Sequence, residues 1–276
     1  MIGAGLCWSS GGLLVRAQTL TNPWEVVLWR SVFMVSFMVA LICIMRRGNS
    51  WARVQAVGWT GVLSGALLCS TFFFFVIAIT RNPVANTLVL MSVGPFVVAV
   101  LARLILGERV LARTWAAIVV AVGGIVLMSV HGLGSEFHPS VFLALGVPIA
   151  GGLNVVLLRS VRHQVDMVPT VMIAGLMSIV IAAPLALPFS ANLWDLTMLA
   201  IMGVVQLGIG CVLMTIAVRD LPASEVGLLG LLETILGTVW VWMAFGERPG
   251  ELAILGGLVV VGAVLVNQLS ALRSGR

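Results

Sequence analysis

A stretch in the first half of the chain recurs 139 residues later without a gap. Residues 83–109 read PVANTLVLMSVGPFVVAVLARLILGER, and residues 222–248 read PASEVGLLGLLETILGTVWVWMAFGER. Six positions are identical, and landmarks are fixed at both ends, because Pro opens each copy and Gly-Glu-Arg closes it. A weak repeat with fixed ends predicts a chain built from two similar halves.

Both copies are apolar and long enough to cross a lipid bilayer as helices. A helix from Pro222 to Gly246 rises about 37 Å, since each residue adds ~1.5 Å and the hydrocarbon core is ~30 Å thick. The rest of the chain has the same character, because 61% of its 276 residues are hydrophobic and 9% are charged. A soluble domain carries roughly 25% charged residues. The composition therefore predicts an all-α polytopic membrane protein with no soluble domain.

Ten apolar segments, separated by short connections, are predicted to be transmembrane helices. Cap signals support their boundaries: Asn22-Pro23 gives the second segment an Asn cap and a Pro at the first helical position. Gly107 and Gly246 fit positions just past helix ends. The predicted spans are residues 2–18, 23–45, 54–79, 83–106, 112–130, 139–161, 167–188, 194–218, 222–245 and 250–269.

The placement of arginine predicts the orientation of these spans. With the N-terminus inside, eleven of the fifteen Arg residues fall on the cytoplasmic side, three fall outside and Arg30 lies within a span. Positive loops face the cytoplasm, so we expect an inner (plasma) membrane protein with both termini cytoplasmic. Because five spans, an odd number, separate the two copies, the copies cross the membrane in opposite directions. The predicted architecture is two five-helix inverted-topology repeats, residues 1–134 and 135–276.

Inverted repeats predict a transport mechanism, because two similar halves can exchange roles and open a central cavity to either side in turn. The sequence contains no HExxH, GxGxxG or Walker A motif and no Asp-rich metal motif. We therefore expect a non-enzyme without catalytic residues, metal or cofactor. The expected partners are a small-molecule substrate and the lipid bilayer, with no nucleic acid, and the sequence is compatible with a monomer.

Two charged side chains lie within predicted spans. Glu233 lies about 17 Å into the ninth span, near the midplane, and Arg30 lies about 10 Å inside the second. Charges at such depths are expensive and usually functional. A guanidinium matches a carboxylate, and a carboxylate can bind an ammonium group or a proton, so the pair predicts a zwitterion site. The structural alternatives are Ser, Thr or Trp donors around Glu233, and an ion pair or backbone carbonyls around Arg30.

Neutral polar side chains within the spans complete the predicted substrate site. They interrupt the first span ahead of a Gly pair, or are isolated amides in the fourth, sixth and eighth spans. For these residues, hydrogen bonds between helices remain the structural alternative. The run from Phe72 to Phe75 is interpreted as lipid-facing and core packing, and Met91 and Met214 as core residues able to soften a pocket. The predicted substrate-binding residues are Trp8, Ser10, Arg30, Asn86, Asn154, Gln206 and Glu233.

These residues resemble a known family, the EamA-like branch of the drug/metabolite transporter superfamily. Each of its halves carries a Pro…Pro…Leu-Gly-Glu pattern followed by a Gly-rich span. The matching positions in this chain are Pro83, Pro95, Leu106-Gly107-Glu108, Phe245-Gly246-Glu247, Trp8, Ser10, Arg30 and Glu233. The chain departs from the family at Thr234, where Pro usually follows the Glu. The resemblance implies a ten-helix transporter, often an exporter of amino acids or related metabolites.

The expected function is export of small amphipathic metabolites, with amino acids first, across the inner membrane by alternating access. One alternative is a proton-coupled exporter of drug-like or nucleotide-sugar-type compounds. A second alternative is a membrane-embedded lipid-modifying enzyme, and a third is a structural membrane subunit that transports nothing.

Overall fold

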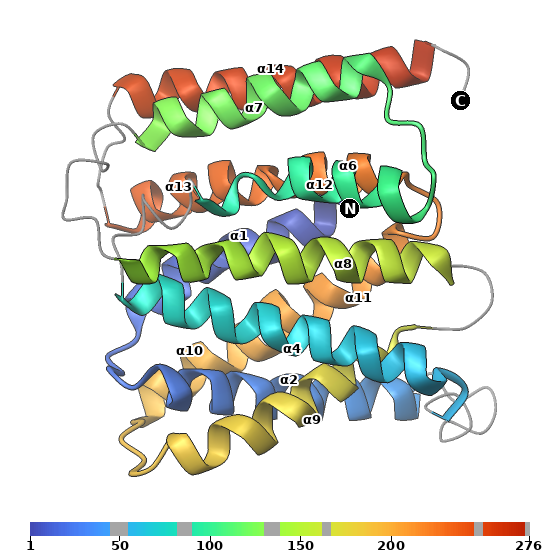
Figure 1. The fold of residues 1–276 in the computed structure, drawn as a ribbon. Coiled ribbons are helices and arrows are strands. Elements are labelled where there is room, and N and C mark those ends of the chain that lie inside the picture. Colours follow the sequence, from blue (N-terminus) through green and yellow to red (C-terminus); the bar gives the residue numbers. More distant parts are fainter. Residues whose placement is uncertain (45–54, 82–89, 130–138, 162–166, 246–250, 274–276) are drawn as a thin grey trace.

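The computed structural model describes residues 1–44, 55–81, 90–129, 139–161, 167–245 and 251–273, and every regular element within them is a helix (Figure 1). η2 and η3 are 3-10 helices and η4 is a π-helix. The elements are α1 (Ile2–Ala17), α2 (Pro23–Ile44), α4 (Gly58–Arg81), α6 (Gly94–Ile105), α7 (Ala112–Ser129), η2 (Pro139–Leu145), α8 (Gly146–Ser160), α9 (Pro169–Ala182), η3 (Ala183–Leu185), α10 (Leu193–Ile201), η4 (Met202–Ile209), α11 (Gly210–Ala217), α12 (Ala223–Gly230), α13 (Leu232–Phe245) and α14 (Glu251–Arg273).

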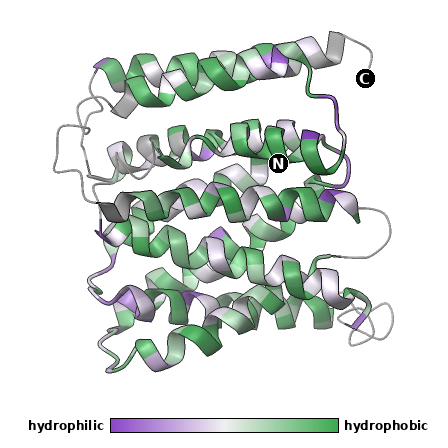
Figure 2. Ribbon diagram, in the orientation of Figure 1, coloured by the Kyte–Doolittle hydropathy of each residue, from purple (hydrophilic) through white to green (hydrophobic). Residues whose placement is uncertain are grey.

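Ten apolar helical segments occur in the described ranges, one at each predicted span, and residues 83–89 of the predicted fourth span lie outside the described residues. Five are long and apolar enough to cross a membrane: Pro23–Ile44, Gly58–Arg81, Phe142–Ser160, Leu193–Ala217 and Ala223–Ala244. The other five are shorter: Ile2–Val15, Gly94–Ile105, Ala112–Leu127, Pro169–Leu185 and Ile254–Asn267. Figure 2 shows that apolar residues dominate the helices and that hydrophilic residues gather mostly at helix ends. The predicted all-α membrane class is confirmed.

Segments far apart in the sequence lie side by side. α1 packs against α13 and against η4 and α11, whereas α8 packs against α6 and α4. α9 contacts both α2 and α4, and α2 also contacts η4. α7 and α14 run together along one edge of the molecule (Figure 1). Their backbones approach closely at Gly124, where an added Cβ would lie 2.8 Å from the Gly256 carbonyl oxygen.

Two helical segments are interrupted one repeat length apart. The turn residues Ser92 and Val93 precede α6, and Leu231 separates α12 from α13. Ser92 and Leu231 are 139 positions apart, the offset of the sequence repeat. At the second interruption the Leu231 amide donates to the Leu228 carbonyl (3.2 Å), three residues back, instead of continuing the α-helical pattern.

The span Leu193–Ala217 changes helix type twice, because the π-helix η4 lies between α10 and α11. Its N-terminus is capped by Asn192, whose side chain accepts from the Asp195 amide (2.9 Å) in a capping box. A π-helix has a wider turn, is rare and occurs often at functional sites. It changes the direction in which the side chains around Gln206 point, an effect that apolar periodicity does not predict.

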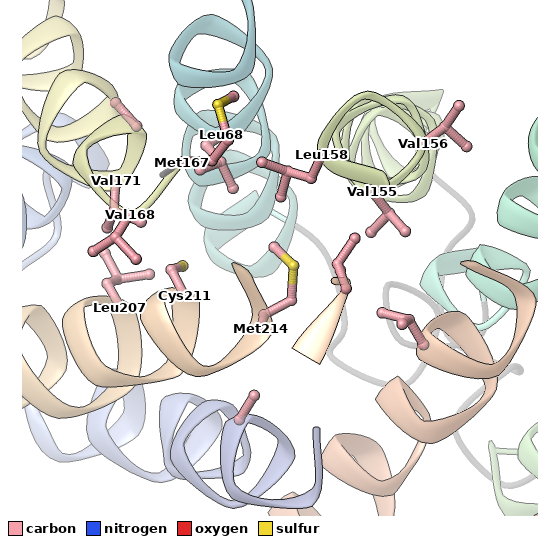
Figure 3. Packing of buried hydrophobic residues seen from close by; sticks show 14 of the residues in the cluster. Leu68, Val155, Val156, Leu158, Met167, Val168, Val171, Leu207, Cys211 and Met214 are labelled. Atoms are coloured by element: carbon pink, nitrogen blue, oxygen red, sulfur yellow. The ribbon is translucent and has the colours of Figure 1, made fainter. Parts of the chain in front are cut away.

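The largest hydrophobic cluster lies where α4, α8, α9 and the η4–α11 segment meet. Figure 3 shows Leu68 of α4, Val155 and Leu158 of α8, and Cys211 and Met214 of α11 converging in this region. Each of these residues is at least 92% buried. The burial joins elements from both halves of the sequence around the centre of the molecule.

Candidate functional site

A cavity of about 250 Å³ lies among α1, α2, α4, α6, α8, η4, α11, α12 and α13. Both helix interruptions reach it, through Ser92 and Leu231. Most of its wall is apolar and includes Leu68 and Met214 of the central cluster. The predicted site residues on its wall are Trp8, Arg30, Asn154, Gln206 and Glu233.

Arg30 projects from α2 and is 1% exposed. Its Nη2 donates to the Phe72 carbonyl on α4 (2.9 Å), and its guanidinium lies 5.5 Å from the centre of the Phe72 ring. The carbonyl contact that the sequence left as an alternative is therefore present. This contact does not use every N–H group of the Arg30 guanidinium, because Nε has no hydrogen-bond partner within the described ranges. Arg30 thus keeps a donor for another group.

Glu233 lies in the first turn of α13, directly after the interruption at Leu231. A carboxylate there complements the partial positive charge of the helix N-terminus. The side chain is half-buried and lines the cavity. No hydrogen bond or ion pair joins it to another residue of the ranges that the structure describes. Glu233 therefore presents a carboxylate to the cavity without being held by Ser, Thr or Trp donors from those ranges.

Gln206 and Trp8 are placed by reciprocal contacts between α1 and the η4–α11 segment. Gln206 Nε2 donates to the Trp8 carbonyl (3.4 Å), and an added Cβ on Gly11 would lie 1.9 Å from this nitrogen. In the other direction, a Cβ on Gly210 would lie 2.6 Å from Trp8 Nε1. Each helix therefore needs a glycine where the other projects a cavity-lining side chain. Gln206 is 4% exposed, and its Oε1 has no partner in the described part of the chain.

Asn154 lies on α8, is fully buried and is oriented by a residue of α4. The Ser64 hydroxyl, also fully buried, donates to Asn154 Oδ1 (2.6 Å). This bond leaves Asn154 Nδ2 without a partner among the described residues. Asn154 therefore keeps an unpaired N–H donor beside the cavity that the residue lines, and a neighbouring helix fixes the orientation of its amide.

Two predicted site residues are not placed with the other five. Ser10 does not belong to the cavity wall, and its hydroxyl donates to the Cys7 carbonyl (2.7 Å) one turn earlier. The neighbouring Ser9 has the interhelical role, because its hydroxyl accepts from Trp240 Nε1 (2.8 Å) on α13. Asn86 lies outside the described residues, within 82–89.

Among the described residues, the cavity wall combines one cation, one carboxylate and two amides in an apolar surround. Arg30 Nε and Asn154 Nδ2 are free donors, and Gln206 Oε1 is a free acceptor. A buried polar group without a hydrogen bond costs about 1–3 kcal/mol, and a bound solute that completes the bond recovers this free energy. The arrangement suits reversible binding of a small polar solute.

Comparison with known proteins agrees with this interpretation. The model of the EamA-like transporter family matches residues 1–130 and again residues 138–268. The chain belongs to the EamA-like transporter family. It is therefore a membrane transporter by family.

Two curated relatives of this EamA transporter are pseudopaline exporters CntI from Pseudomonas aeruginosa strains UCBPP-PA14 and PAO1. Each is 28% identical over 272 residues, a match that covers 95% of this chain and 92% of the relative. A solved crystal structure with 19% sequence identity covers 100% of this chain and 98% of its own, with a TM-score of 0.82. That likeness shows the EamA transporter to have a fold already seen in a crystal.

Sequence reasoning missed several residues that build the cavity of this EamA transporter. Phe72 and Phe75 were assigned to lipid-facing and core packing, but both line the cavity, and Phe72 also binds Arg30. Ser64 was not singled out, because its partner lies 90 residues away. A period of three to four along α4 links Ser64, Leu68, Phe72 and Phe75, and this spacing was the available signal. Met91 and Met214 line the cavity as expected.

Proposed function

We propose that this EamA transporter exports small amphipathic metabolites, amino acids being the first class to test, by alternating access around the central cavity. The observation that carries the proposal is the placement of Arg30 and Glu233 on the wall of one cavity. No ion pair joins them in the described structure, so both charges remain available. A zwitterion has the opposite charges that would neutralise the two side chains.

The proposed mechanism uses two similar halves, and the pairing of helix contacts supports that repeat. Under the predicted repeat, α1 corresponds to α8, α2 to α9, α4 to the α10–α11 segment, and α6 to α12 and α13. The contact of α1 with α13 then has its counterpart in α8 with α6. Likewise, α1 with η4 and α11 corresponds to α8 with α4, and α2 with η4 corresponds to α9 with α4. A two-fold relation between two similar halves gives this exchange of partners, and the odd number of predicted spans between the copies would make the halves inverted.

The direction of transport and the membrane follow from separate arguments. The P. aeruginosa relatives are exporters, which favours export here. The bias of arginine toward one side favours an inner membrane location with both termini cytoplasmic. The partners are then a small-molecule substrate and the bilayer, and one copy of the chain supplies all the cavity residues described.

The test is uptake of labelled amino acids into vesicles that contain the full-length protein. Arg30→Ala and Glu233→Gln should each reduce the rate at least about tenfold, because each removes a charged contact worth about 1.5–3 kcal/mol. The matched controls are Arg103→Gln on α6 and Glu251→Gln on α14, two exposed charges outside the cavity. Amino-acid transport at the wild-type rate in both cavity variants would rule out the proposal.

A second candidate, proton-coupled export of drug-like or nucleotide-sugar-type compounds, is favoured by one observation. Glu233 makes no ion pair within the described ranges and lines the cavity two residues after the interruption at Leu231. Such a carboxylate can take up and release a proton during a transport cycle. Transport would then depend on pH in the wild type and lose this dependence in Glu233→Gln. Persistence of the pH dependence in that variant would exclude Glu233 as the proton carrier.

A further inference from the structure

An ion pair joins the two predicted halves of the chain at the end of the molecule where α6 and α8 end (Figure 1). Arg159 lies in the last turn of α8, and its Nε donates to Oε1 of Glu108 (2.9 Å), just past the end of α6. The two side chains are 12% and 25% exposed. The pair is therefore mostly buried, and it connects a residue of the first half with a residue of the second.

Hydrogen bonds extend this ion pair to the connection between α11 and α12. Arg159 Nη1 donates to the carbonyls of Val218 (3.3 Å) and Arg219 (2.9 Å). The Ala223 amide donates to Glu108 Oε2 (3.3 Å). Both charged side chains thus bind the backbone of the same connection. We call these five residues the latch, because together they fasten the ends of α6 and α8 to the α11–α12 connection.

The backbone at the end of α6 places Glu108. Gly107 has a φ of +66°, a conformation that glycine adopts without steric cost. The chain turns there, and the Glu108 amide donates to the Ala102 carbonyl (3.2 Å). The main chain of Glu108 is therefore held by α6, whereas its carboxylate is held by α8 and by the α11–α12 connection.

The latch lies about one helical turn beyond the cavity on three segments. The cavity-lining residues nearest to it are Val155 of α8, Met214 of α11 and Val226 of α12. Each is three or four residues from a latch residue of the same segment, a rise of about 5–6 Å at ~1.5 Å per residue. The latch is thus next to one end of the cavity without lining it.

Buried apolar side chains close the cavity at this end. Ala102, Leu158, Val218 and Ala223 belong to the central cluster, are at most 2% exposed and do not line the cavity. They come from α6, from α8 and from the two sides of the α11–α12 connection, which are the segments that the latch fastens together. A polar solute that leaves the cavity at this end has to separate these segments.

We propose that the latch locks this end of the cavity, and that its ion pair breaks each time the cavity opens to that side. The inference rests on the alternating access of the proposed function, and it assigns the closure of one side to named residues. The bias of arginine predicts that this side faces the cytoplasm. An ion pair that borders water contributes only modestly to stability, as a contact that breaks in every cycle requires.

The cavity contains its own reporter of opening, because Cys211 of α11 lines it. The other cysteines, Cys7, Cys43 and Cys69, do not line it. Full-length protein with all three replaced by alanine keeps the single thiol and is the reference for every comparison. A charged, membrane-impermeant methanethiosulfonate is added to one face of membrane vesicles at a time. The labelling rate of Cys211 then measures how often the cavity opens to that face, and no substrate is needed.

Glu108→Gln and Arg159→Gln should each speed labelling from the predicted cytoplasmic face at least about threefold. Labelling from the opposite face should stay the same or become slower. The two substitutions change the charge in opposite directions, so an effect on the approach of the charged reagent would have opposite signs in the two variants. Opening of the latch has the same sign in both.

The double variant Glu108→Gln/Arg159→Gln should label about as fast as the single variants, because both substitutions break one contact and their effects do not add. Glu251→Gln and Arg103→Gln are the matched controls, since these two charges are exposed and lie outside the latch. Neither control should change the labelling rate from either face.

The outcomes separate the latch from the proposed function. Unchanged labelling in both single variants, opposite changes in the two, or an equal increase from both faces would overturn the latch. Amino-acid transport by the wild type would stand in each of these cases, because uptake of labelled amino acids tests it separately. Faster labelling from one face in a protein that transports no amino acid would support the latch and exclude the proposed substrate class.

Discussion

The buried carboxylates Glu25 and Asp195, which join helix ends, are hydrogen-bonded, whereas three buried side chains of the cavity each keep an unpaired polar atom. At one end, the fully buried Glu25 accepts hydrogen bonds from the Ser190 amide (2.9 Å), the Ser190 hydroxyl (2.8 Å) and the Ala191 amide (2.9 Å). Asp195, also fully buried, accepts from the Thr19 amide (2.7 Å) and hydroxyl (2.9 Å). In the cavity, by contrast, equally buried side chains leave donors and acceptors unused.

The opposite end of the molecule resembles the first. Arg159 forms an ion pair with Glu108 (2.9 Å) and donates to the Arg219 carbonyl (2.9 Å), while the Ala223 amide donates to Glu108 (3.3 Å). These satisfied groups join connections between helices and stabilise the fold. The unsatisfied groups in between reduce stability and remain available to a solute, a division expected where function opposes stability.

The largest expected effect concerns Glu25, whose hydrogen bonds connect helix ends. Glu25→Ala removes a buried acceptor that takes three hydrogen bonds from Ser190 and Ala191, so we expect a loss of about 3 kcal/mol. For a chain of this size that loss lowers the melting temperature by about 6–12 °C. Thermal unfolding followed by tryptophan fluorescence measures it.

Glu251→Ala is the control for that change, since this carboxylate is exposed in the first turn of α14. Its effect should stay within about 0.5 kcal/mol. Equal melting temperatures for Glu25→Ala and the wild type would mean that the end contacts are not structural, and the contrast with the cavity would disappear.

The second-largest expected effect concerns a cavity residue, for which we expect transport to fall without a loss of stability. Arg30→Met replaces an incompletely paired buried cation by an apolar side chain of similar length, which removes the cost of burying a charge. We therefore expect transport to fall at least about tenfold while the melting temperature stays the same or rises. Exchange in vesicles measures the transport rate, and thermal unfolding of the same preparation measures the melting temperature.

Arg103→Met, at an exposed position of α6, is the control and should change neither the transport rate nor the melting temperature. A clear fall in the melting temperature of Arg30→Met would show that the bond to the Phe72 carbonyl outweighs the burial of the charge. Arg30 would then belong with the structural groups at the helix ends.

A charged residue within an apolar segment was easy to recognise in the sequence. A residue whose role depends on a distant partner was not. Arg30 and Glu233 stand out because an ionised group in a span is expensive, and both line the cavity. Ser64 escaped notice because a helical serine usually bonds a carbonyl of its own helix, as Ser10 and Ser70 do. Only the tertiary fold brings Ser64 to Asn154.

Glu25 illustrates a related limit. A carboxylate in the first turn of a helix such as α2 is typically explained by the helix dipole, but the Glu25 carboxylate binds the connection that precedes α10. The ten spans were predictable because each depends on a long local run of apolar residues. The π-helix η4 was not, because its composition is the same as that of the α-helices on either side.

The third effect tests how the cavity side chains are placed. Gly11→Ala would put a Cβ 1.9 Å from Gln206 Nε2, so the flexible amide has to move and its contact with the Trp8 carbonyl is lost. We expect a moderate fall in transport, about threefold to tenfold, with a loss of stability of about 1 kcal/mol. Gly12→Ala is the matched control, since nothing lies within 4 Å of its Cβ position. Equal transport by the two variants would remove Gln206 from the site.

The smallest effect compares two adjacent hydroxyls on α1. Ser9 accepts from Trp240 of α13 (2.8 Å), so Ser9→Ala breaks a contact between helices and leaves the indole N–H unpaired. Interhelical hydrogen bonds in membrane proteins contribute about 0.6 kcal/mol on average, with a maximum near 1.7. Ser10→Ala removes only a bond to its own helix and should change stability less. Thermal unfolding of both variants shows which substitution lowers stability more. A larger loss for Ser10→Ala would mean that this hydroxyl has a second role, and the division between satisfied structural groups and open cavity groups would have to be redrawn along α1.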